Sequence, residues 1–284
     1  MPDKRIGMIG SASFVGERLR LLLEKEGYDI TAFSRQGGKD TVALHALSTV
    51  SVGMIENWLY LAPIWTLPEH FELLEDHGGK RLVALSSTSR FTKIGSNSTS
   101  ERALACRLQE GEEKVLEWAR LHGWTVVILQ PTLIYGLGKD KNVTEIAQFI
   151  QRFGFFPLFG RGEGLRQPVH VDDVSMACVS ALNIPEGRIC TYVLSGEDVV
   201  SYRTMVERIF TALGRKPRFI RCPLIVFTLA VRLANLFPPY KGLTTEMAVR
   251  MNKDQHFDHT AAGTDLGFQP RSFHPLLSDF TAGC

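Results

Sequence analysis

Two glycines near the amino terminus, with small residues between them, have the spacing of a phosphate-binding turn. The turn runs from Gly10 to Gly16 as Gly-Ser-Ala-Ser-Phe-Val-Gly, after a short apolar run and before a leucine-rich helical pattern. Gly10 permits a tight turn, Gly16 permits close packing of helix on strand, and the small residues let the backbone approach a pyrophosphate. The first N–H groups of the helix would face this anion. Unless it is only a tight strand-to-helix turn, the pattern predicts a dinucleotide site formed by Gly10, Ser11, Ser13, Phe14, Val15 and Gly16.

The residues after the second expected strand bear on the choice of nucleotide. This strand, residues 28–33, ends in Ser34 and Arg35. A site for NAD usually places an acidic side chain here, where it binds the ribose hydroxyls. A guanidinium can instead pair with a 2′-phosphate and stack on adenine. We therefore expect NADP in preference to NAD, the alternative being that Arg35 is one solvated charge in a polar turn.

Apolar runs alternate with helical patterns along the chain, in the order that a parallel sheet requires. Right-handed crossovers place the carboxyl ends of such strands along one edge of the sheet, where a ligand binds. We expect an α/β fold, a Rossmann-type doubly wound parallel sheet with a smaller, mostly helical C-terminal substrate-binding domain. The expected strands are residues 5–9, 28–33, 57–62, 81–85 and 125–129, and the expected helices are 68–77 and 100–122.

The same patterns divide the chain into two parts. The Rossmann domain is expected over residues 1–195, with an inserted segment on the substrate side near 137–165. The smaller substrate-binding domain is expected over residues 196–284. With 284 residues, 44% of them hydrophobic, the chain is long enough for one doubly wound domain and a smaller partner.

Charge and cysteine usage narrow the partners and the compartment. A net charge of +2 without a long basic run gives no electrostatic case for nucleic acid. The five cysteines are odd in number and lack metal-site spacing, which suits reduced thiols. Residues 1–5 lead directly into a strand rather than into the apolar core of a signal peptide. We therefore expect a cytoplasmic protein whose partner is a small-molecule substrate.

One apolar segment, residues 223–237, raises the question of a membrane span. It is shorter than the roughly 20 residues that a membrane span requires and has Arg232 in its middle. We expect a buried or interfacial helix here and no transmembrane span. A homodimer surface and a peripheral membrane contact remain alternatives.

Motifs distributed over nearly the whole chain resemble those of the extended short-chain dehydrogenases/reductases, in the NAD-dependent epimerase/dehydratase family. No single motif carries the resemblance, but the order and spacing of all of them do. The motifs are Gly10 to Gly16, Leu61-Ala62-Pro63, Ser86-Ser87-Thr88, Gln130 to Gly136, Val169 to Val174, Tyr202 to Gly214 and Asp265 to Pro270.

The resemblance implies a catalytic arrangement that this chain does not complete. In such enzymes a hydroxyl after the fifth strand polarises a substrate oxygen, a tyrosine transfers a proton, and a lysine one helical turn later lowers the pKa of the tyrosine and holds the nicotinamide ribose. The hydroxyl falls on Thr88, whose alternative role is to cap a strand end. The tyrosine and lysine fall on Ala105 and Gln109, and no tyrosine lies between Tyr60 and Tyr135. Gln109 can hydrogen-bond a ribose but cannot tune an acid.

The resemblance also extends the expected nucleotide site beyond the first turn. It implies contacts from the ends of several strands, all at the same edge of the sheet. The residues it adds are Ser34, Arg35, Leu61, Ala62, Pro63, Ser86, Gln109, Gln130 and Pro131.

Tyr135 and Lys139 have the Tyr-x-x-x-Lys spacing but are poor candidates for the missing pair. Gly136 and Gly138 make a helix improbable between them, so the two side chains need not share a face. The resemblance places a Tyr-Gly pair in a loop near the nicotinamide. Tyr135 is therefore a candidate pocket residue and a candidate substitute acid.

Two further residues concern the substrate and a possible metal. Arg166 lies four residues before His170, where the resemblance to nucleotide-sugar enzymes implies an arginine that pairs with a substrate diphosphate. Its alternative is a loop arginine. His170 precedes Asp172 and Asp173, but only one histidine is local, and the resemblance implies that one of these aspartates caps the following helix. We expect no metal.

Two functions remain open on these grounds. The first is an NAD(P)-dependent epimerase, dehydratase or reductase that acts on a nucleotide sugar or a related carbonyl compound without the Tyr-x-x-x-Lys pair. The second is a non-catalytic NAD(P)-binding sensor or assembly protein, which the missing pair favours. Turnover distinguishes the two, and a scaffold without a working nucleotide site would fail to bind the cofactor.

Overall fold

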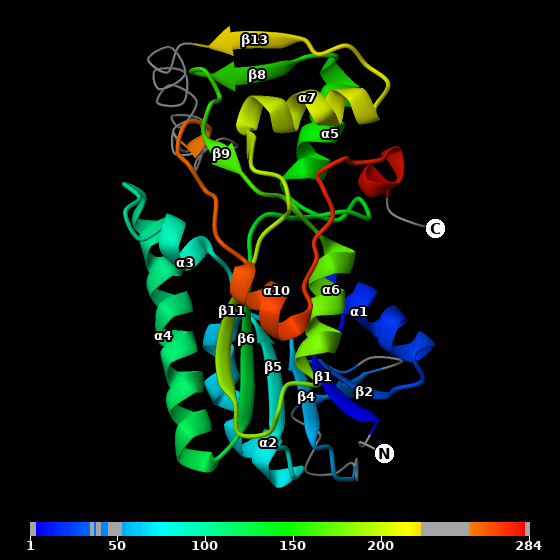
Figure 1. The fold of residues 1–284 in the computed structure, drawn as a ribbon, viewed down its shortest axis with the longest axis vertical. Helices are drawn as coiled ribbons and strands as arrows, with labels where there is room; N and C mark the ends of the chain where they lie inside the picture. Colours follow the sequence, from blue (N-terminus) through cyan, green and yellow to red (C-terminus); the bar gives the residue numbers. More distant parts are fainter. Residues whose placement is uncertain (1–3, 35–36, 38–40, 45–52, 223–249, 282–284) are drawn as a thin grey trace.

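The computed structural model describes residues 4–34, 37, 41–44, 53–222 and 250–281. A seven-stranded parallel sheet forms the larger part of this structure, and a smaller lobe of helices and short strands lies beyond the carboxyl ends of its strands (Figure 1). The Rossmann-type fold expected from the sequence is thus confirmed.

The strand order of the sheet is β11-β6-β5-β4-β1-β2-β3. The chain starts at the centre with β1, builds outward on one side, and crosses back to build the other, which is the doubly wound order. The apolar runs that predicted strands are buried on both faces, as a covered parallel sheet requires. The strands are β1 (Arg5–Ile9), β2 (Asp29–Ser34), β3 (Val42–Ala43), β4 (Asn57–Tyr60), β5 (Arg81–Leu85), β6 (Thr125–Pro131) and β11 (Ile189–Leu194).

Helices cover both faces of the sheet. On one face lie α1 (Phe14–Lys25) and α6 (Val171–Ala181), whose apolar side chains share a core with β1, β4, β5 and β6. The 3-10 helix η2 (Ile64–His70), α2 (Phe71–Asp76) and α4 (Thr99–His122) enclose a second core on the opposite face. The short α3 (Ser89–Thr92) follows β5 and packs on α4.

Local sequence explains where the longer elements end. Helix α4 stops at Gly123, which takes the left-handed conformation with φ +70° that ends many helices. The helix expected over residues 68–77 is instead a 3-10 helix followed by six residues of α-helix, because Pro68 lies inside the segment and cannot donate a helical hydrogen bond. The third strand, which has no clear pattern in the sequence, is only two residues long.

The smaller lobe is built around α5 (Val143–Phe153) and α7 (Tyr202–Ala212), which pack on each other. Their apolar faces join Tyr135, Met251 and Phe273 in a third core. Pairs of short strands frame the lobe: β7 (Ile134–Tyr135) with β10 (Val169–His170), β8 (Phe156–Phe159) with β13 (Phe219–Cys222), and β9 (Leu165–Arg166) with β12 (Val200–Ser201). The 3-10 helix η4 (Leu277–Phe280) packs on α5.

The carboxyl-terminal region does not stay in the smaller lobe. Helix α10 (Thr260–Leu266) returns to the sheet and contacts β11 and α6 (Figure 1). Ala262, Leu266 and Phe268 are buried in the same core as β1 and α1. Residues 260–268, which the sequence assigns to the smaller domain, therefore pack as part of the larger one.

Within the described residues, no helix has the length and apolar character that crossing a membrane would take. The apolar segment 223–237 lies outside the described residues.

Candidate functional site

The first turn of the fold has the close approaches that its two glycines predict. Gly10 has φ +87°, and a Cβ there would lie 2.7 Å from the backbone nitrogen of Ala62. A Cβ on Gly16 would lie 2.4 Å from the carbonyl oxygen of Gly10. The Ser13 hydroxyl caps α1 by accepting a hydrogen bond from the Gly16 amide at 3.1 Å. This cradle, with a helix amino terminus facing it, fits a pyrophosphate.

The other nucleotide residues expected from the turn have different roles in the structure. Val15 is buried in the core beneath α1, so only its backbone can face a nucleotide. Ser11 is buried in the turn, and Phe14 lines the large cavity described below. The Ser34 hydroxyl is 3.1 Å from that of Thr41. Arg35, the basis for preferring NADP, lies outside the described residues.

The segment Leu61-Ala62-Pro63 directly follows β4 at the carboxyl edge of the sheet. The amide of Leu61 donates to the carbonyl of Ile9 at 2.8 Å, which extends the pairing of β4 with β1 up to the glycine turn. Leu61 itself is buried among the core side chains. The segment therefore lies at the carboxyl edge of the sheet, against Gly10.

A buried carboxylate, Glu112 of α4, holds the ends of β5 and β6 together. Its side chain is 1% exposed and accepts hydrogen bonds from the Ser86 hydroxyl and the Arg90 guanidinium. Gln130 donates to the same carboxylate at 2.8 Å. Ser86 and Gln130, both expected to face the nucleotide, thus use their side chains in this network. Glu112 was not predicted from the sequence. The available signal was an acidic residue on the apolar stripe of a long helix.

The family positions for the catalytic tyrosine and lysine do not supply an acid. Ala105 is fully buried. Gln109 is exposed, and its amide donates to the Glu113 carboxylate one turn along the same helix at 2.9 Å. The expectation that Gln109 binds a ribose is therefore corrected, because its side chain lies on the solvent side of α4.

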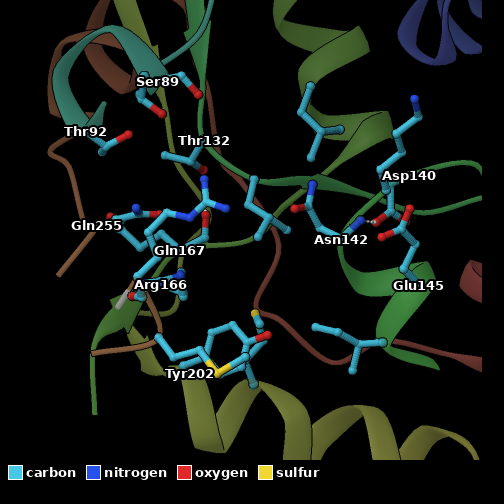
Figure 2. Close-up of a pocket in the computed structure, with 18 of the residues that line it drawn as sticks. Ser89, Thr92, Thr132, Asp140, Asn142, Glu145, Arg166, Gln167, Tyr202 and Gln255 are labelled. Atoms are coloured by element: carbon cyan, nitrogen blue, oxygen red, sulfur yellow. Dashed lines mark hydrogen bonds between the residues drawn. The ribbon is translucent and has the colours of Figure 1, made fainter. Parts of the chain in front are cut away.

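A cavity of about 830 Å³ lies between the carboxyl edge of the sheet and the smaller lobe. The loop and helix after β5 line one side of it, and the start of α5 lines another; Figure 2 shows Ser89 and Thr92 across the cavity from Asn142 and Glu145. Its apolar lining comes from Ile146, Phe149, Phe156, Phe159, Met205 and Met251. The cavity is large enough for a small-molecule ligand that reaches from the sheet edge into the lobe.

Thr88 lies at the wall of this cavity. It is buried, and its hydroxyl donates to the carbonyl of Pro131 at 3.1 Å. The same residue is the cap position of α3. Its hydroxyl oxygen can still accept a hydrogen bond, so the structural and the binding role are compatible.

Tyr135 does not line the cavity, which corrects its expected role as a substitute acid. It is 1% exposed in the third core, with its ring edge-on to those of His170 and Phe273. Burial, with the nearby charge of Asp279, raises the pKa of Tyr135, so the phenol keeps its proton. Lys139 is at the surface and pairs with Glu17 of α1. The Tyr-x-x-x-Lys spacing at residues 135–139 is thus coincidental.

Arg166 faces the cavity but is largely committed to the backbone. Its guanidinium donates to the carbonyls of Leu165 at 2.6 Å, Lys253 at 2.8 Å and Arg250 at 2.5 Å, and it lies 5.4 Å from the ring centre of Tyr202. Burial lowers the pKa of Arg166 to about 10, which still leaves it charged near neutral pH. Figure 2 shows it beside Gln167 and Gln255.

Lys93 is a cavity residue that the sequence analysis did not identify. It follows α3, lines the cavity with Thr88 and Thr92, and is half-buried. Burial lowers the pKa of the Lys93 ammonium; the charge of Glu101 opposes this shift and that of Arg250 adds to it. A lysine of lowered pKa in a cavity wall has the property required of a general acid. A lone lysine in a helix–loop segment carries no sequence signal for this role.

His170 rather than an aspartate caps α6. Its Nδ1 accepts a hydrogen bond from the amide of Asp172 at 3.2 Å, and its Nε2 lies 3.3 Å from Asp279. Asp172 and Asp173 instead pair with Arg271. The segment thus fixes the carboxyl-terminal tail to α6, which corrects the expected aspartate cap.

Comparison with known proteins finds a family model that matches part of this chain. Residues 70–193 match the model of the NAD-dependent epimerase/dehydratase family, and the fold is that of solved epimerases of this type. The resemblance stated from the sequence is confirmed. The residues that match the family model run from the end of η2 into β11 and include Thr88, Glu112 and Tyr135.

Among curated proteins, the mitochondrial NADH dehydrogenase [ubiquinone] 1 alpha subcomplex subunit 9 of Arabidopsis thaliana is 30% identical over 151 residues, or 52% of this chain and 35% of the relative. The chain spans half or less of the length of the curated relatives it matches.

Two solved structures illustrate the likeness in fold. The UDP-N-acetylglucosamine 4-epimerase from Bacillus cereus has a TM-score of 0.70 and 14% identity, with 94% of this chain and 91% of that chain covered. MoeE5 in complex with UDP-glucose and NAD has a TM-score of 0.69 and 19% identity, with 94% of each chain covered.

Proposed function

We propose that the protein binds NADP or NAD at the turn from Gly10 to Gly16 and holds a carbonyl or carbinol compound, such as a nucleotide sugar, in the adjoining cavity. The observation that carries the proposal is the position of the 830 Å³ cavity, which meets the nucleotide turn at Phe14 and the carboxyl end of β5 at Thr88. A substrate there would lie next to the nucleotide, as the doubly wound fold requires.

The nucleotide site fits the cofactor on steric grounds. Gly10 and Gly16 leave the space that a Cβ would fill, and the start of α1 faces that space. When bound, the nicotinamide would accept or supply a hydride. The preference for NADP rests on Arg35 alone and is part of the proposal.

In this chain, the proton that accompanies the hydride would come from Lys93. Thr88 would orient the substrate oxygen by accepting or donating a hydrogen bond, and the neighbouring Lys93 ammonium would give a proton to a developing alkoxide or take one back. The buried Tyr135 takes no part. This arrangement replaces the tyrosine and lysine that α4 lacks.

A nucleotide sugar is the substrate class that two observations support. The structural relatives include a UDP-N-acetylglucosamine 4-epimerase and MoeE5 bound to UDP-glucose and NAD. In the cavity, Arg166 provides a fixed positive charge, and the N–H groups that its three carbonyl partners leave free could donate to a diphosphate.

Turnover with a carbonyl panel tests this function. Nucleotide sugars and simple ketones are offered with NADPH and NADH, and the change in nicotinamide absorbance is followed for the wild type, Lys93→Met and Lys93→Arg. We expect Lys93→Met to lower kcat by about a hundredfold or more with little change in cofactor affinity, the scale of lost general acid catalysis. Equal turnover by wild type and Lys93→Met would remove Lys93 from the mechanism.

A non-catalytic nucleotide-binding protein is the second candidate. Ala105 and the exposed Gln109 occupy the places of the missing acid/base pair. The relative from Arabidopsis thaliana is an NADH dehydrogenase subunit by name, which supports a role for this chain in a protein assembly. Tight cofactor binding with no turnover on the panel favours this candidate.

We also propose that the protein works in the cytoplasm. Cys106, Cys178 and Cys190 are free thiols among the described residues, as a reducing compartment allows. A homodimer stays part of the proposal and is tested by light scattering.

A further inference from the structure

The end of the smaller lobe carries a surface on which aromatic and basic side chains alternate. Two segments form it: the carboxyl-terminal end of α5 with the residues directly after it, and the loop between α7 and β13 with the start of β13 (Figure 1). The Phe156 amide donates to the carbonyl of Arg218 at 2.9 Å, and the Arg215 guanidinium donates to the carbonyl of Ile150 at 2.7 Å. We call the aromatic–basic patch the surface formed by Arg152, Phe153, Phe155, Lys216, Arg218 and Ile220.

The apolar side chains of the patch are unusually open to solvent. Phe153 is 50% exposed and Ile220 is 49% exposed. The rings of Phe153 and Phe155 have their centres 6.3 Å apart, so they form one apolar surface. Gly154 between them has φ +77°, which ends the helix. Phe153 is exposed and Phe155 is partly exposed.

The charge of the patch has a single sign. Residues 148–156 and 212–220 contain Arg152, Arg215, Lys216 and Arg218, and no aspartate or glutamate. The Arg152 guanidinium lies over the Phe153 ring, 5.2 Å from its centre. Arg215 is occupied with the helix end, but Lys216 and Arg218 are exposed. The exposed Phe153 ring therefore lies in two segments that carry several cations and no acidic residue.

We propose that the aromatic–basic patch binds the surface of an anionic lipid bilayer. At such a surface, rings enter the boundary between headgroups and acyl chains while basic side chains stay at the level of the phosphates. Both kinds of side chain in the patch are satisfied at once by that environment. An acidic protein partner would pair with the cations, but it would also need an apolar recess that matches the rings. Because a lipid surface does not have this additional requirement, we favour it as the partner.

The patch adjoins the ligand cavity through a row of rings. Phe149 lies 4.6 Å from Phe153 and 5.8 Å from both Phe155 and Phe156, between ring centres. Phe149 and Phe156 both line the cavity. A protein docked by this patch would hold the α5 wall of its cavity close to the lipid surface.

Vesicle co-sedimentation of the full chain tests the proposal. Vesicles of phosphatidylcholine alone are compared with vesicles of phosphatidylcholine and phosphatidylserine, at low and high salt. We expect binding to the anionic vesicles only, with a loss at high salt. Lys216→Glu with Arg218→Glu should weaken binding by at least about 25-fold, from about fivefold for each cation removed. Phe153→Ser should weaken it independently.

Matched surface changes on α4 serve as controls. Lys114→Glu with Arg120→Glu repeats the charge reversal on exposed residues of that helix, and Leu121→Ser removes a side chain that is 76% exposed. These variants should bind like the wild type. Thermal unfolding of every variant shows that the fold is retained.

A tryptophan placed by Phe153→Trp reports contact directly. We expect lipids with a nitroxide near the headgroup to quench its fluorescence. The proposal is overturned if the wild type does not bind anionic vesicles, if it binds neutral ones equally, or if the patch variants bind as well as the controls. Conversion of a dimer to a monomer by Phe153→Ser, without vesicle binding, would make the patch an interface between two copies.

Discussion

Gly16 is the residue on which the nucleotide site depends most directly. A Cβ at this position would lie 2.4 Å from the Gly10 carbonyl oxygen, within the turn that faces the nucleotide. We expect Gly16→Ala to displace α1 from the turn, with a loss of about 1–3 kcal/mol in stability and at least about a tenfold loss in nucleotide affinity. Calorimetric titration and thermal unfolding measure the two effects.

Gly263→Ala is the matched control for that change. Gly263 lies in α10, and its nearest neighbour to a new Cβ is the Phe268 carbonyl oxygen at an ordinary 3.5 Å. Alanine there should keep or raise stability, by up to about 1 kcal/mol. Equal behaviour of the two alanine variants would show that the turn tolerates a side chain at residue 16.

Lys93 gives the proposed reaction a pH dependence. Burial holds the pKa of Lys93 below its usual value of 10.5. A general acid must be protonated to act, so kcat for carbonyl reduction should fall as the pH rises through this lowered pKa. Lys93→Arg stays protonated, so its kcat should not decrease over this pH range. A wild-type kcat that is constant up to pH 10.5 would contradict the role of Lys93 as the general acid.

Substitution of Glu112 tests whether its carboxylate stabilises the ends of β5 and β6. Glu112→Ala removes the acceptor used by Ser86, Arg90 and Gln130. Because Arg90 is partly exposed, we expect a loss of about 2–4 kcal/mol rather than the cost of a fully buried unpaired charge. Denaturant unfolding measures it. Glu113→Ala, on the exposed face of the same helix, should change stability by less than about 0.5 kcal/mol.

At the scale of elements, α5 owes its start to a residue ahead of it. The Asp140 carboxylate accepts hydrogen bonds from the amides of Asn142 and Thr144, at 2.9 Å and 3.1 Å. We expect Asp140→Ala to cost about 1–2 kcal/mol and Asp140→Asn to cost less, since an amide oxygen can still accept. Because α5 is a cavity wall, the alanine variant should also bind cavity ligands more weakly.

The carboxyl-terminal tail is attached to the fold by a carboxylate whose pKa is lowered. Burial alone would raise the pKa of Asp279, but hydrogen bonds from His170 and the Leu276 amide outweigh it and hold the pKa below 3.8. The stabilisation is therefore complete above pH 3.8 and is lost as the pH falls through the lowered pKa.

Acid unfolding checks this attachment. Asp279→Asn should be less stable than the wild type at neutral pH, and the two should converge as the pH falls below 3.8. A stability difference that stays constant down to strongly acid pH would show that the carboxylate charge does not hold the tail.

For the whole molecule, the fold could be predicted because most of the longer strands of the sheet carry a signal of their own in the sequence. The apolar runs at residues 5–9, 81–85 and 125–129 are buried strands of the sheet. The alternation of strands and helices then leaves few topologies. The return of α10 to the sheet was not predictable in this way, because its seven residues carry too little pattern to choose between the two parts.

The site was less accessible to sequence reasoning than the fold. Turn residues such as Gly10 have a local conformational requirement, so their role can be stated from the sequence. The roles of Lys93 and Glu112 depend on interactions with residues distant in the chain. Tyr135 is buried in a core, where its ring packs on those of His170 and Phe273. Tertiary packing decides these roles, and no short-range pattern encodes it.

Above all, we propose that the turn from Gly10 to Gly16 binds a nicotinamide dinucleotide. The most direct test is calorimetric titration of the nucleotide-free protein with NADPH and with NADH, for the wild type, Gly16→Ala and Arg35→Asp. We predict one site per chain and tighter binding of NADPH than of NADH. Gly16→Ala should weaken the binding of both nucleotides, and Arg35→Asp should weaken the preference for NADPH. Failure of the wild type to bind either nucleotide at high micromolar concentration would contradict it.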